Sequence, residues 1–302
     1  MLGLVTAEVA APLDPDLEPL ADACRDRLGA DRVRVVDWHD STVDWSSFDA
    51  VVIRSTWDYT TRLDEFLAWV DRASTATSLV NDGGIVRWNA DKVYLRDLAD
   101  DGIPVTPTVF VEPGHQPPAV EGVHVVKPSV GAGSAGARRC EPDEVADHVA
   151  ALHRDGRTAM VQPYLERLDA LGETAHCFVP GPVGSGPVFS HAFGKAAILR
   201  STDVEQVGDL FAKEDITTRV PTDAELDLAR AVLDAPSIRR FGDVGFARID
   251  IAPMRGPDGT DRFVVMEAEL IEPSFYFEKT PGSVDVFADA LVARLNGERV
   301  SP

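Results

Sequence analysis

The sequence predicts an α/β protein with a parallel sheet in its N-terminal part, followed by two lobes that mix helices and strands. Apolar strand-like runs alternate with amphipathic helix-like stretches up to about residue 85, which is typical of parallel βαβ units. Two further patterns follow, a strand–glycine loop–strand run and an apolar hairpin. A chain of 302 residues can form two or three small domains that share one site. We expect these domains at 1–85, 86–157 and 158–302.

In the first segment, Gly29 ends one predicted helix, and Thr61 with Asp64 three residues later resembles a capping box at the start of another. The expected strands are Leu2–Ala7, Val33–Val36, Ala50–Ile53 and Leu79–Val80, and the expected helices are Asp16–Leu28 and Thr61–Ala73. Ligands of parallel sheets bind at the carboxyl ends of the strands. The loop after the third strand is therefore predicted to line a substrate pocket, and it comprises Arg54, Ser55, Thr56, Trp57, Asp58 and Tyr59.

The second segment carries two lysines in apolar surroundings. Asn89 is placed to cap a helix Ala90–Ala99 that holds Lys92, and Lys127 lies in the strand Val123–Pro128. A lone strand lysine usually extends to solvent, but the two together can neutralise a polyphosphate. A strand Thr106–Val111 and a helix Pro142–His153 complete the segment.

A glycine-rich loop follows Lys127. Gly131, Gly133 and Gly136 match G-x-G-x-x-G, with Ser134 between the last two. A dinucleotide site needs a helix directly after this loop, whereas here Ala137–Cys140 looks like a strand. The context favours a flap that covers phosphates with backbone N–H groups, the alternative being a plain hairpin loop.

The third segment opens with the strand-like run Ala159–Tyr164. The stretch Gln162–Leu165 contains a proline and fits either an interdomain hinge, whose backbone can contact an adenine edge, or an ordinary edge strand. His191 could serve as a general base, although a strand histidine is more often structural. Thr222 and Glu225 form a capping box before a long helix.

Two apolar strands, Phe246–Ile251 and Phe263–Leu270, are separated by a turn and predict a hairpin. Because side chains alternate along a strand, Arg248 shares a face with Asp250, and Glu267 shares a face with Glu269. Three facing carboxylates require a cation, and oxygen ligands alone favour Mg²⁺ or Mn²⁺. The alternative is a solvated face of an acidic protein.

The formal net charge is −21 at pH 7, so neither nucleic acid nor an anionic membrane is an expected partner. The three cysteines, Cys24, Cys140 and Cys177, are far apart, which argues for a reducing cytoplasm and against a disulfide scaffold. Neither a signal peptide nor an apolar run long enough to cross a bilayer is visible.

In this order the motifs resemble the ATP-grasp superfamily, the fold of glutathione synthetase and D-alanine–D-alanine ligase, over nearly the whole chain. More specific strings are similar to the subgroup of the cyclo-ligase that closes O-ureido-D-serine into D-cycloserine. These strings are Ser-Thr-Trp-Asp-Tyr at 55–59, Trp-Asn-x-Asp-Lys at 88–92, Val-Lys-Pro at 126–128 and Glu-x-Glu-Leu-x-Glu-Pro at 267–273.

The resemblance implies an ATP-grasp fold that follows a Rossmann-like domain, with ATP held between two lobes. It implies the following roles: Lys92 and Lys127 at the phosphates, Gly131, Gly133, Ser134 and Gly136 as the flap, Gln162, Pro163, Tyr164 and Leu165 at adenine, Glu173 near the ribose, and Asp250, Glu267 and Glu269 at Mg²⁺ (or Mn²⁺). Arg248, Lys195 and His191 are the implied catalytic residues. Most superfamily members end the metal motif in Glu-x-Asn, where this chain has Glu269.

The resemblance further implies an ADP-forming ligase that phosphorylates a small amino-acid-like substrate and forms a C–N or ring bond, as the cyclo-ligase does. Two alternatives stay open: a carboxylate–amine ligase of the glutathione-synthetase type that works through an acyl phosphate, and an ATP-binding protein without turnover. The expected partner is a small molecule, and a homodimer is the candidate assembly.

Overall fold

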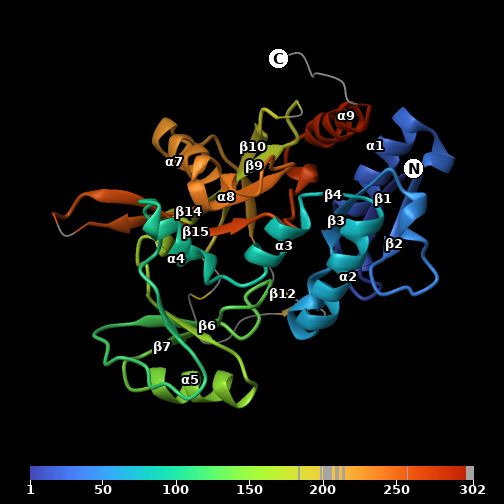
Figure 1. Cartoon of the computed structure of the whole chain (residues 1–302). Coiled ribbons are helices and arrows are strands. Elements are labelled where there is room, and N and C mark those ends of the chain that lie inside the picture. The colour runs from blue at the N-terminus through green and yellow to red at the C-terminus, as the bar shows by residue number, and fades with distance from the viewer. Residues whose placement is uncertain are drawn as a thin grey trace.

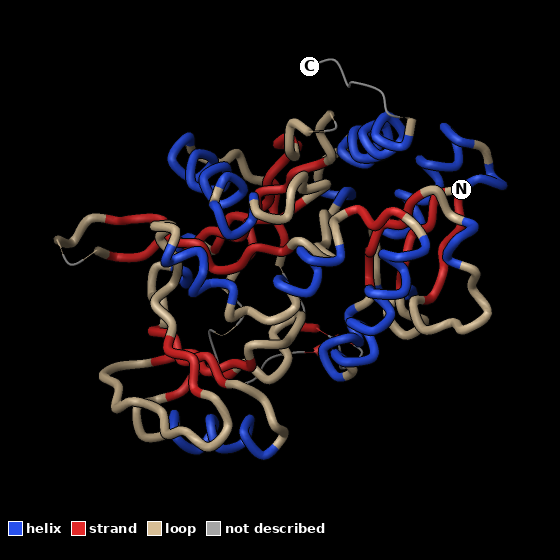
Figure 2. Tube along the Cα trace, viewed as in Figure 1, coloured by secondary structure: helices blue, strands red, loops and turns tan. Residues whose placement is uncertain are grey.

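The computed structural model describes residues 1–182, 184–197, 199, 206–207, 211–212, 215–256 and 258–296 (Figure 1). Figure 2 separates the strands of the sheets from the helices that cover them. The strands are β1 (Leu2–Thr6), β2 (Val33–Asp37), β3 (Ala50–Ser55), β4 (Ser78–Val80), β5 (Val109–Val111), β6 (His124–Pro128), β7 (Arg138–Cys140), β8 (Ala159–Pro163), β9 (Glu173–Val179), β10 (Val188–Lys195), β11 (Gln206–Val207), β12 (Phe211–Ala212), β13 (Ile216–Thr218), β14 (Ala247–Arg255) and β15 (Asp261–Glu269). The α-helices are α1 (Leu17–Leu28), α2 (Leu63–Ala76), α3 (Gly83–Asn89), α4 (Tyr94–Asp100), α5 (Val145–Arg154), α6 (Leu168–Leu171), α7 (Asp223–Asp234), α8 (Pro236–Arg239) and α9 (Ser283–Leu295).

The N-terminal sheet is parallel, as predicted, with strand order β2-β1-β3-β4. Successive side chains along β1 and β3 point to opposite sides of the sheet, and all of them are buried, so both faces of the sheet are covered. Leu4 and Val52 pack in one apolar cluster with α1 and α9, and Val5 and Ile53 pack in another with α2. The C-terminal helix α9 therefore completes the N-terminal unit, and Figure 1 shows it beside α1.

The central sheet is antiparallel with strand order β5-β8-β6-β7, and α5 packs on it. Strand β8 pairs with both β5 and β6, so this sheet extends to Pro163. The boundary that we drew after residue 157 is too early for the sheet, because β8 belongs with the strands before it. The division into domains otherwise stays a prediction.

The C-terminal sheet is antiparallel and has the strand order β13-β10-β9-β14-β15. The hairpin β14–β15 forms as predicted, and Arg248 pairs with Glu269 while Asp250 pairs with Glu267. Helices α4 and α7 share one apolar cluster with this sheet. The capping box of Thr222 and Glu225 at the start of α7 is confirmed.

The predicted helix Ala90–Ala99 is wrong at its start. Helix α3 ends at Asn89 and α4 begins at Tyr94, so Lys92 lies in a turn between them. Tertiary bonds outweigh the local capping preference here. The Asn89 side chain donates to Ala268 O (2.7 Å) and accepts from Leu270 N (2.8 Å), and Lys92 N donates to Ser129 O (2.9 Å).

Two other element boundaries differ from expectation. Thr61 belongs to a 3₁₀ turn, Trp57–Thr61, and its hydroxyl donates to Asp58 O (3.0 Å), so it does not cap α2. Thr106 N donates to Val265 O (2.9 Å), and this bond to the C-terminal sheet leaves only Val109–Val111 in strand β5.

Asn81 ties the N-terminal unit to the C-terminal lobe. Its amide nitrogen donates to Phe246 O (2.8 Å) and Leu270 O (2.7 Å), and its amide oxygen accepts from Gly245 N (2.6 Å). The apolar cluster of α1 and α9 also includes Ala175 and Phe246 of the C-terminal lobe. No helix in the described part of the chain is both long enough and apolar enough to span a membrane.

Candidate active site

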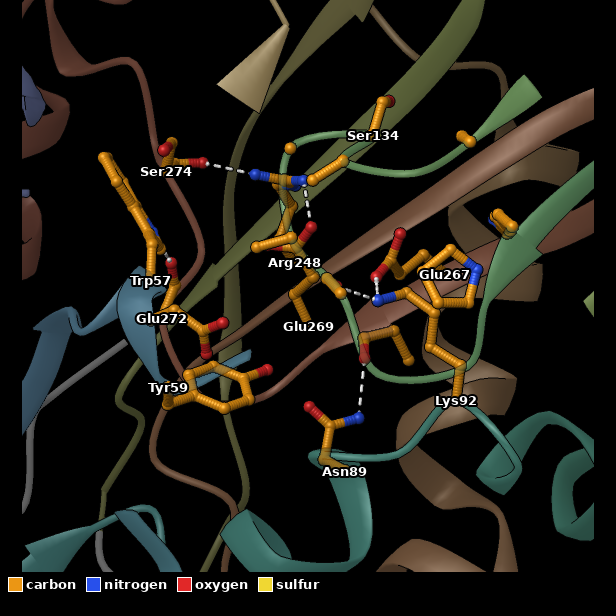
Figure 3. Close-up of a pocket in the computed structure, with 18 of the residues that line it drawn as sticks. Trp57, Tyr59, Asn89, Lys92, Ser134, Arg248, Glu267, Glu269, Glu272 and Ser274 are labelled. Carbon is orange, nitrogen blue, oxygen red and sulfur yellow. Dashed lines mark hydrogen bonds and ion pairs between the residues drawn. The ribbon is translucent and has the colours of Figure 1, made fainter. Parts of the chain in front are cut away.

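A cavity of about 300 Å³ lies where the three units meet (Figure 3). It is lined by Leu13, Pro15, Trp57, Tyr59, Asn89, Lys92, Tyr94, Lys127, Pro128, Gly131, Ala132, Gly133, Ser134, Ala135, Ala137, Lys195, Arg248, Glu267, Ala268, Glu269, Glu272, Ser274 and Tyr276. The glycine loop, both lysines of the second segment and the charged face of the β14–β15 hairpin therefore line one cavity.

Arg248 is the centre of an ion-pair cluster on this hairpin. Its Nε and Nη2 donate to the two oxygens of Asp250 at 2.9 Å each, and Nη2 also pairs with Glu269. Lys195 Nζ lies 3.0 Å from Asp250 Oδ2 and 2.6 Å from Glu173 Oε1. Arg248, Asp250 and Lys195 are buried, which excludes the alternative of a solvated acidic face.

The two lysines of the second segment differ in their partners. Lys92 Nζ lies 2.9 Å from Glu267 Oε1 and also donates to Gly131 O at the start of the glycine loop. Lys127 has no hydrogen-bond or ion-pair partner among the described residues, and burial lowers the pKa of its ammonium group. Lys127 is half-buried and lines the cavity, and desolvation of a cation without a partner is costly unless an anion joins it, so Lys127 marks a place for an anionic ligand.

The carboxylates of the cluster differ in their pKa values. Burial raises the pKa of Glu269 to about 8, with Arg248 opposing this shift and the charges of Glu267 and Asp250 adding to it. For Glu267, burial is outweighed by Lys92 and Lys127, and the pKa is lowered. For Asp250, burial is likewise outweighed by Arg248 and Lys195, and the pKa lies far below its ordinary value. At Glu269, burial therefore outweighs the ion pair with Arg248.

The predicted metal ligands fit a divalent cation only in part. Glu267 and Glu269 line the cavity and offer hard oxygen donors. Both oxygens of Asp250 are already bound by Arg248 and Lys195. No group of three His, Cys, Asp or Glu side chains within the described ranges converges as a metal site. Glu267 and Glu269 are thus the better candidates, and Asp250 acts as the partner of Arg248 and Lys195.

The glycine loop is held at both ends. Arg157 Nη2 donates to Val130 O (2.6 Å), and His148 Nε2 donates to Gly136 O (2.9 Å). Within the loop, Gly133 (φ 55°) and Ser134 (φ 62°) adopt left-handed conformations. Such a conformation is unfavourable for serine, and strain of this kind is often found where a loop contacts a ligand.

The segment Glu272–Phe277 is fixed along its backbone. Its successive carbonyl groups accept from Trp57 Nε1 (272 O, 3.3 Å), Arg54 Nη2 (273 O, 3.1 Å), Arg248 Nη1 (274 O, 3.1 Å) and His191 Nε2 (275 O, 2.8 Å). The carboxylate of Asp16 accepts from the N–H groups of residues 275, 276 and 277 at 2.6–2.9 Å. Glu272, Ser274 and Tyr276 of this fixed segment line the cavity.

These bonds correct the prediction for the loop Arg54–Tyr59, since only Trp57 and Tyr59 line the cavity. Arg54 is buried against the rings of Phe275 and Phe287, and Ser55 and Thr56 are also buried.

Asp58 accepts from Trp38 Nε1 (2.9 Å) and pairs with Arg62 (3.6 Å), so its side chain is committed outside the cavity. His191 is also not in the lining: its Nε2 donates to Phe275 O, and its Nδ1 lies 3.0 Å from Ser190 Oγ. These contacts favour a structural role for His191 over that of a general base.

The predicted adenine and ribose contacts lie outside the cavity lining. The Gln162 side chain donates to Thr108 Oγ1 (2.8 Å), and Tyr164 OH donates to Asp169 Oδ1 (2.5 Å). The roles of Gln162–Leu165 and Glu173 stay predictions. Glu173 pairs with Lys195 at the start of β9. The chain can approach Lys195 this closely because residue 172 is glycine, since a Cβ atom there would lie 2.5 Å from Lys195 O.

Sequence reasoning missed the contribution of Glu272, Ser274 and Tyr276 to the cavity. Strand alternation continued from Glu267 would point Glu272 to the opposite face, but β15 ends at Glu269 and alternation no longer applies. Burial raises the pKa of Glu272 to about 7, with Lys92 and a hydrogen bond from Tyr59 opposing the shift. The Glu-Pro pair that ends the charged hairpin was the available signal.

Comparison with known proteins points in one direction. A family model described as the N-terminal domain of D-cycloserine synthetase DcsG matches residues 2–81. The chain is similar to cycloserine biosynthesis protein DcsG of Streptomyces lavendulae. The two sequences are 37% identical over an alignment of 318 residues, which covers 98% of this chain and 99% of that protein.

Solved structures show the same likeness. The crystal structure of D-cycloserine synthetase DcsG superposes with a TM-score of 0.82 at 36% identity, covering 97% of this chain and 99% of the other. The ATP-grasp ligase PsnB, solved with a precursor peptide and AMPPNP, superposes with a TM-score of 0.59 at 18% identity over 98% of each chain. The second likeness concerns the fold alone and identifies it as ATP-grasp.

Proposed function

Because the chain belongs to the family of the cycloserine biosynthesis protein DcsG, we propose that this ATP-grasp ligase closes O-ureido-D-serine into D-cycloserine. The observation that carries the proposal is the relation to DcsG over nearly the full length of both chains. The cavity provides the chemistry that such a reaction needs, with cationic groups for phosphate at one end and a polar, aromatic wall at the other.

Three groups of this chain are suited to hold ATP. Lys127 has no partner among the described residues, and Lys92 lies at the start of the glycine loop, so both ammonium groups can neutralise phosphate oxygens. The glycine loop, fixed by Arg157 and His148, can cover the phosphates with its N–H groups. In this proposal Gln162–Leu165 contact adenine through their backbone and Glu173 lies near the ribose.

Glu267 and Glu269 would hold Mg²⁺, for which Mn²⁺ is a plausible replacement. When bound, the ion neutralises the charge that develops on the transferred phosphoryl group. Lys195 and Arg248 keep Asp250 ionised and hold the charged face of the hairpin in place.

The residues then support phosphorylation of a substrate oxygen and closure of a C–N bond. The γ-phosphoryl group moves from ATP to a carboxylate oxygen of the substrate, the ureido nitrogen attacks the acyl carbon and loses its proton, and phosphate leaves as the C–N bond of the ring forms. Conversion of O-ureido-D-serine into D-cycloserine also removes the carbamoyl group from that nitrogen, and its hydrolysis consumes one water molecule and releases carbon dioxide and ammonia. The nucleotide products are therefore ADP and phosphate. Arg248, whose guanidinium lines the cavity, is placed to stabilise negative charge on the attacked centre. None of these steps requires a covalent enzyme nucleophile.

The test is incubation of the enzyme with MgATP and O-ureido-D-serine, followed by chromatography of nucleotides and amino acids. We expect ADP, phosphate and D-cycloserine in step with one another. AMP and pyrophosphate would refute the phosphoryl-transfer mechanism. ADP release only with an amino acid plus a separate amine would instead indicate a carboxylate–amine ligase of the glutathione-synthetase type.

We place the enzyme in the cytoplasm, since all three cysteines are buried free thiols. A homodimer is the proposed assembly, for which light scattering of the purified protein is the direct test.

A further inference from the structure

The cavity has two ends of different character. At one end, Lys92 contacts Glu267 and the start of the glycine loop, and Lys127 interacts electrostatically with Glu267, Lys92 and Lys195. At the other end, the N-terminal unit and the segment Glu272–Phe277 supply Leu13, Pro15, Trp57, Tyr59, Glu272, Ser274 and Tyr276. Figure 3 shows Trp57, Tyr59 and Glu272 on one side, Lys92 and Glu267 on the other, and Arg248 between them.

Glu272 is the only charged side chain among the described residues that line this second end. Burial raises the pKa of its carboxyl group, the Tyr59 hydroxyl faces that group and lowers its pKa in part, and Glu272 has no ion pair with a described residue. The nearest cations are committed elsewhere: Lys92 pairs with Glu267, and Arg248 binds Asp250, Glu269 and Ser274 O. A carboxylate in a cavity wall gains most from a cationic ligand.

The fold fixes the backbone that carries this carboxylate. Four side chains from three different parts of the chain each bind one carbonyl group of residues 272–275, and Asp16 binds three N–H groups of the same segment. Residues so strongly fixed on one segment suit a recognition site, because preorganised contacts lose little entropy on binding. Aromatic side chains beside the carboxylate, Trp57 and Tyr59, add faces that attract cations.

We propose that Glu272, with Tyr59 and Trp57, binds the α-ammonium group of the substrate. This inference rests on the proposed function, which supplies an amino acid as the substrate. A zwitterion bound in this way points its carboxyl group toward Arg248 and the phosphate end, where activation takes place. Glu272 thereby selects amino acids over simple carboxylic acids and fixes which end of the substrate meets ATP.

The test compares each amino acid with its analogue that lacks the α-amino group, by calorimetry in the presence of Mg²⁺ and AMPPNP. The pairs are O-ureido-D-serine with 3-(ureidooxy)propanoic acid, and D-serine with 3-hydroxypropanoic acid. The wild-type enzyme should bind the amino acid of a pair roughly tenfold or more tightly, as is typical of a close charge pair in a protein interface. Glu272→Gln should lose this preference while its affinity for AMPPNP stays unchanged.

Glu278→Gln is the matched control. It is the same substitution six residues away, at an exposed glutamate that is paired with Lys279. It should keep the full preference. Tyr59→Phe, which removes only the hydroxyl that contacts Glu272, should reduce the preference in part and covers the case in which Glu272→Gln does not fold.

The outcomes separate the two proposals. If the wild-type enzyme binds each amino acid and its analogue without the α-amino group equally well, the ammonium site is wrong. The same holds if Glu272→Gln keeps the preference for the amino acid. If Glu272→Gln instead changes the Mg²⁺ concentration needed for AMPPNP binding, the residue is a metal ligand and the ammonium site is also wrong. If the preference is lost as expected but wild-type enzyme makes no D-cycloserine, the ammonium site stands and the proposed substrate is wrong.

Discussion

Replacing Lys127 by methionine should weaken ATP binding without destabilising the protein. The aliphatic part of the side chain is kept, and the ammonium group has no partner to lose among the described residues. A hydrogen bond to a charged group contributes about 1.5–3 kcal/mol, and each 1.4 kcal/mol changes a dissociation constant about tenfold. We therefore expect ATP affinity to fall roughly 10- to 150-fold.

The stability of the ligand-free protein should not fall when Lys127 is replaced. Desolvation of an ammonium group that has neither a hydrogen bond nor an ion pair with a described residue opposes folding. Removing it should therefore leave the free energy of unfolding of the ligand-free protein unchanged or slightly higher. Lys92→Met is the matched comparison, because it leaves Glu267 without its ion-pair partner and should lower stability.

Calorimetry with AMPPNP and urea unfolding of the ligand-free proteins give the two quantities. A folded Lys127→Met protein with wild-type AMPPNP affinity would refute the assignment of Lys127 to phosphate. A loss of stability as large as that of Lys92→Met would show that Lys127 has a structural partner.

Three other predictions follow from the contacts. Glu267→Gln should abolish turnover at ordinary Mg²⁺ and recover in part at high Mg²⁺, and a Mg²⁺ dependence of ADP release identical to wild type would contradict a ligand role. Asn81→Ala leaves Gly245 N, Phe246 O and Leu270 O without their buried partner. At about 1–3 kcal/mol for each group, urea unfolding should show a loss of several kcal/mol, and a loss below about 1 kcal/mol would count against the clamp. Asp58→Ala should lower stability by about 1 kcal/mol through its bond to Trp38 while turnover of the folded protein persists, so a selective loss of turnover would return Asp58 to the substrate site.

The charged hairpin could be predicted from sequence because its pattern is local. Alternation along two neighbouring strands is enough to place Arg248 with Asp250 and Glu267 with Glu269, and the register confirms both. The parallel N-terminal sheet was predictable for the same reason, since apolar strands and amphipathic helices alternate over short distances.

Failures of prediction occurred where distant segments compete for the same group. Asn89 is a good helix cap by local chemistry, yet its amide binds β15, which lies some 180 residues further along the chain. Arg54 and His191 have the chemistry of catalytic residues, but each is used to bind a carbonyl group of the segment Glu272–Phe277. Periodicity says nothing about that segment, which is irregular, and its role emerges only from the tertiary structure.

Asn81 and the apolar cluster shared by α1, α9 and the C-terminal lobe have a consequence for the order in which ligands meet the enzyme. They hold Trp57 and Tyr59 of the N-terminal unit in a fixed position relative to Glu272 and Arg248. The width of the proposed amino-acid site is therefore set before any ligand binds. Lys127 lies in the central sheet, and the glycine loop connects two of its strands, β6 and β7. An amino acid should therefore meet a preformed site in the ligand-free enzyme.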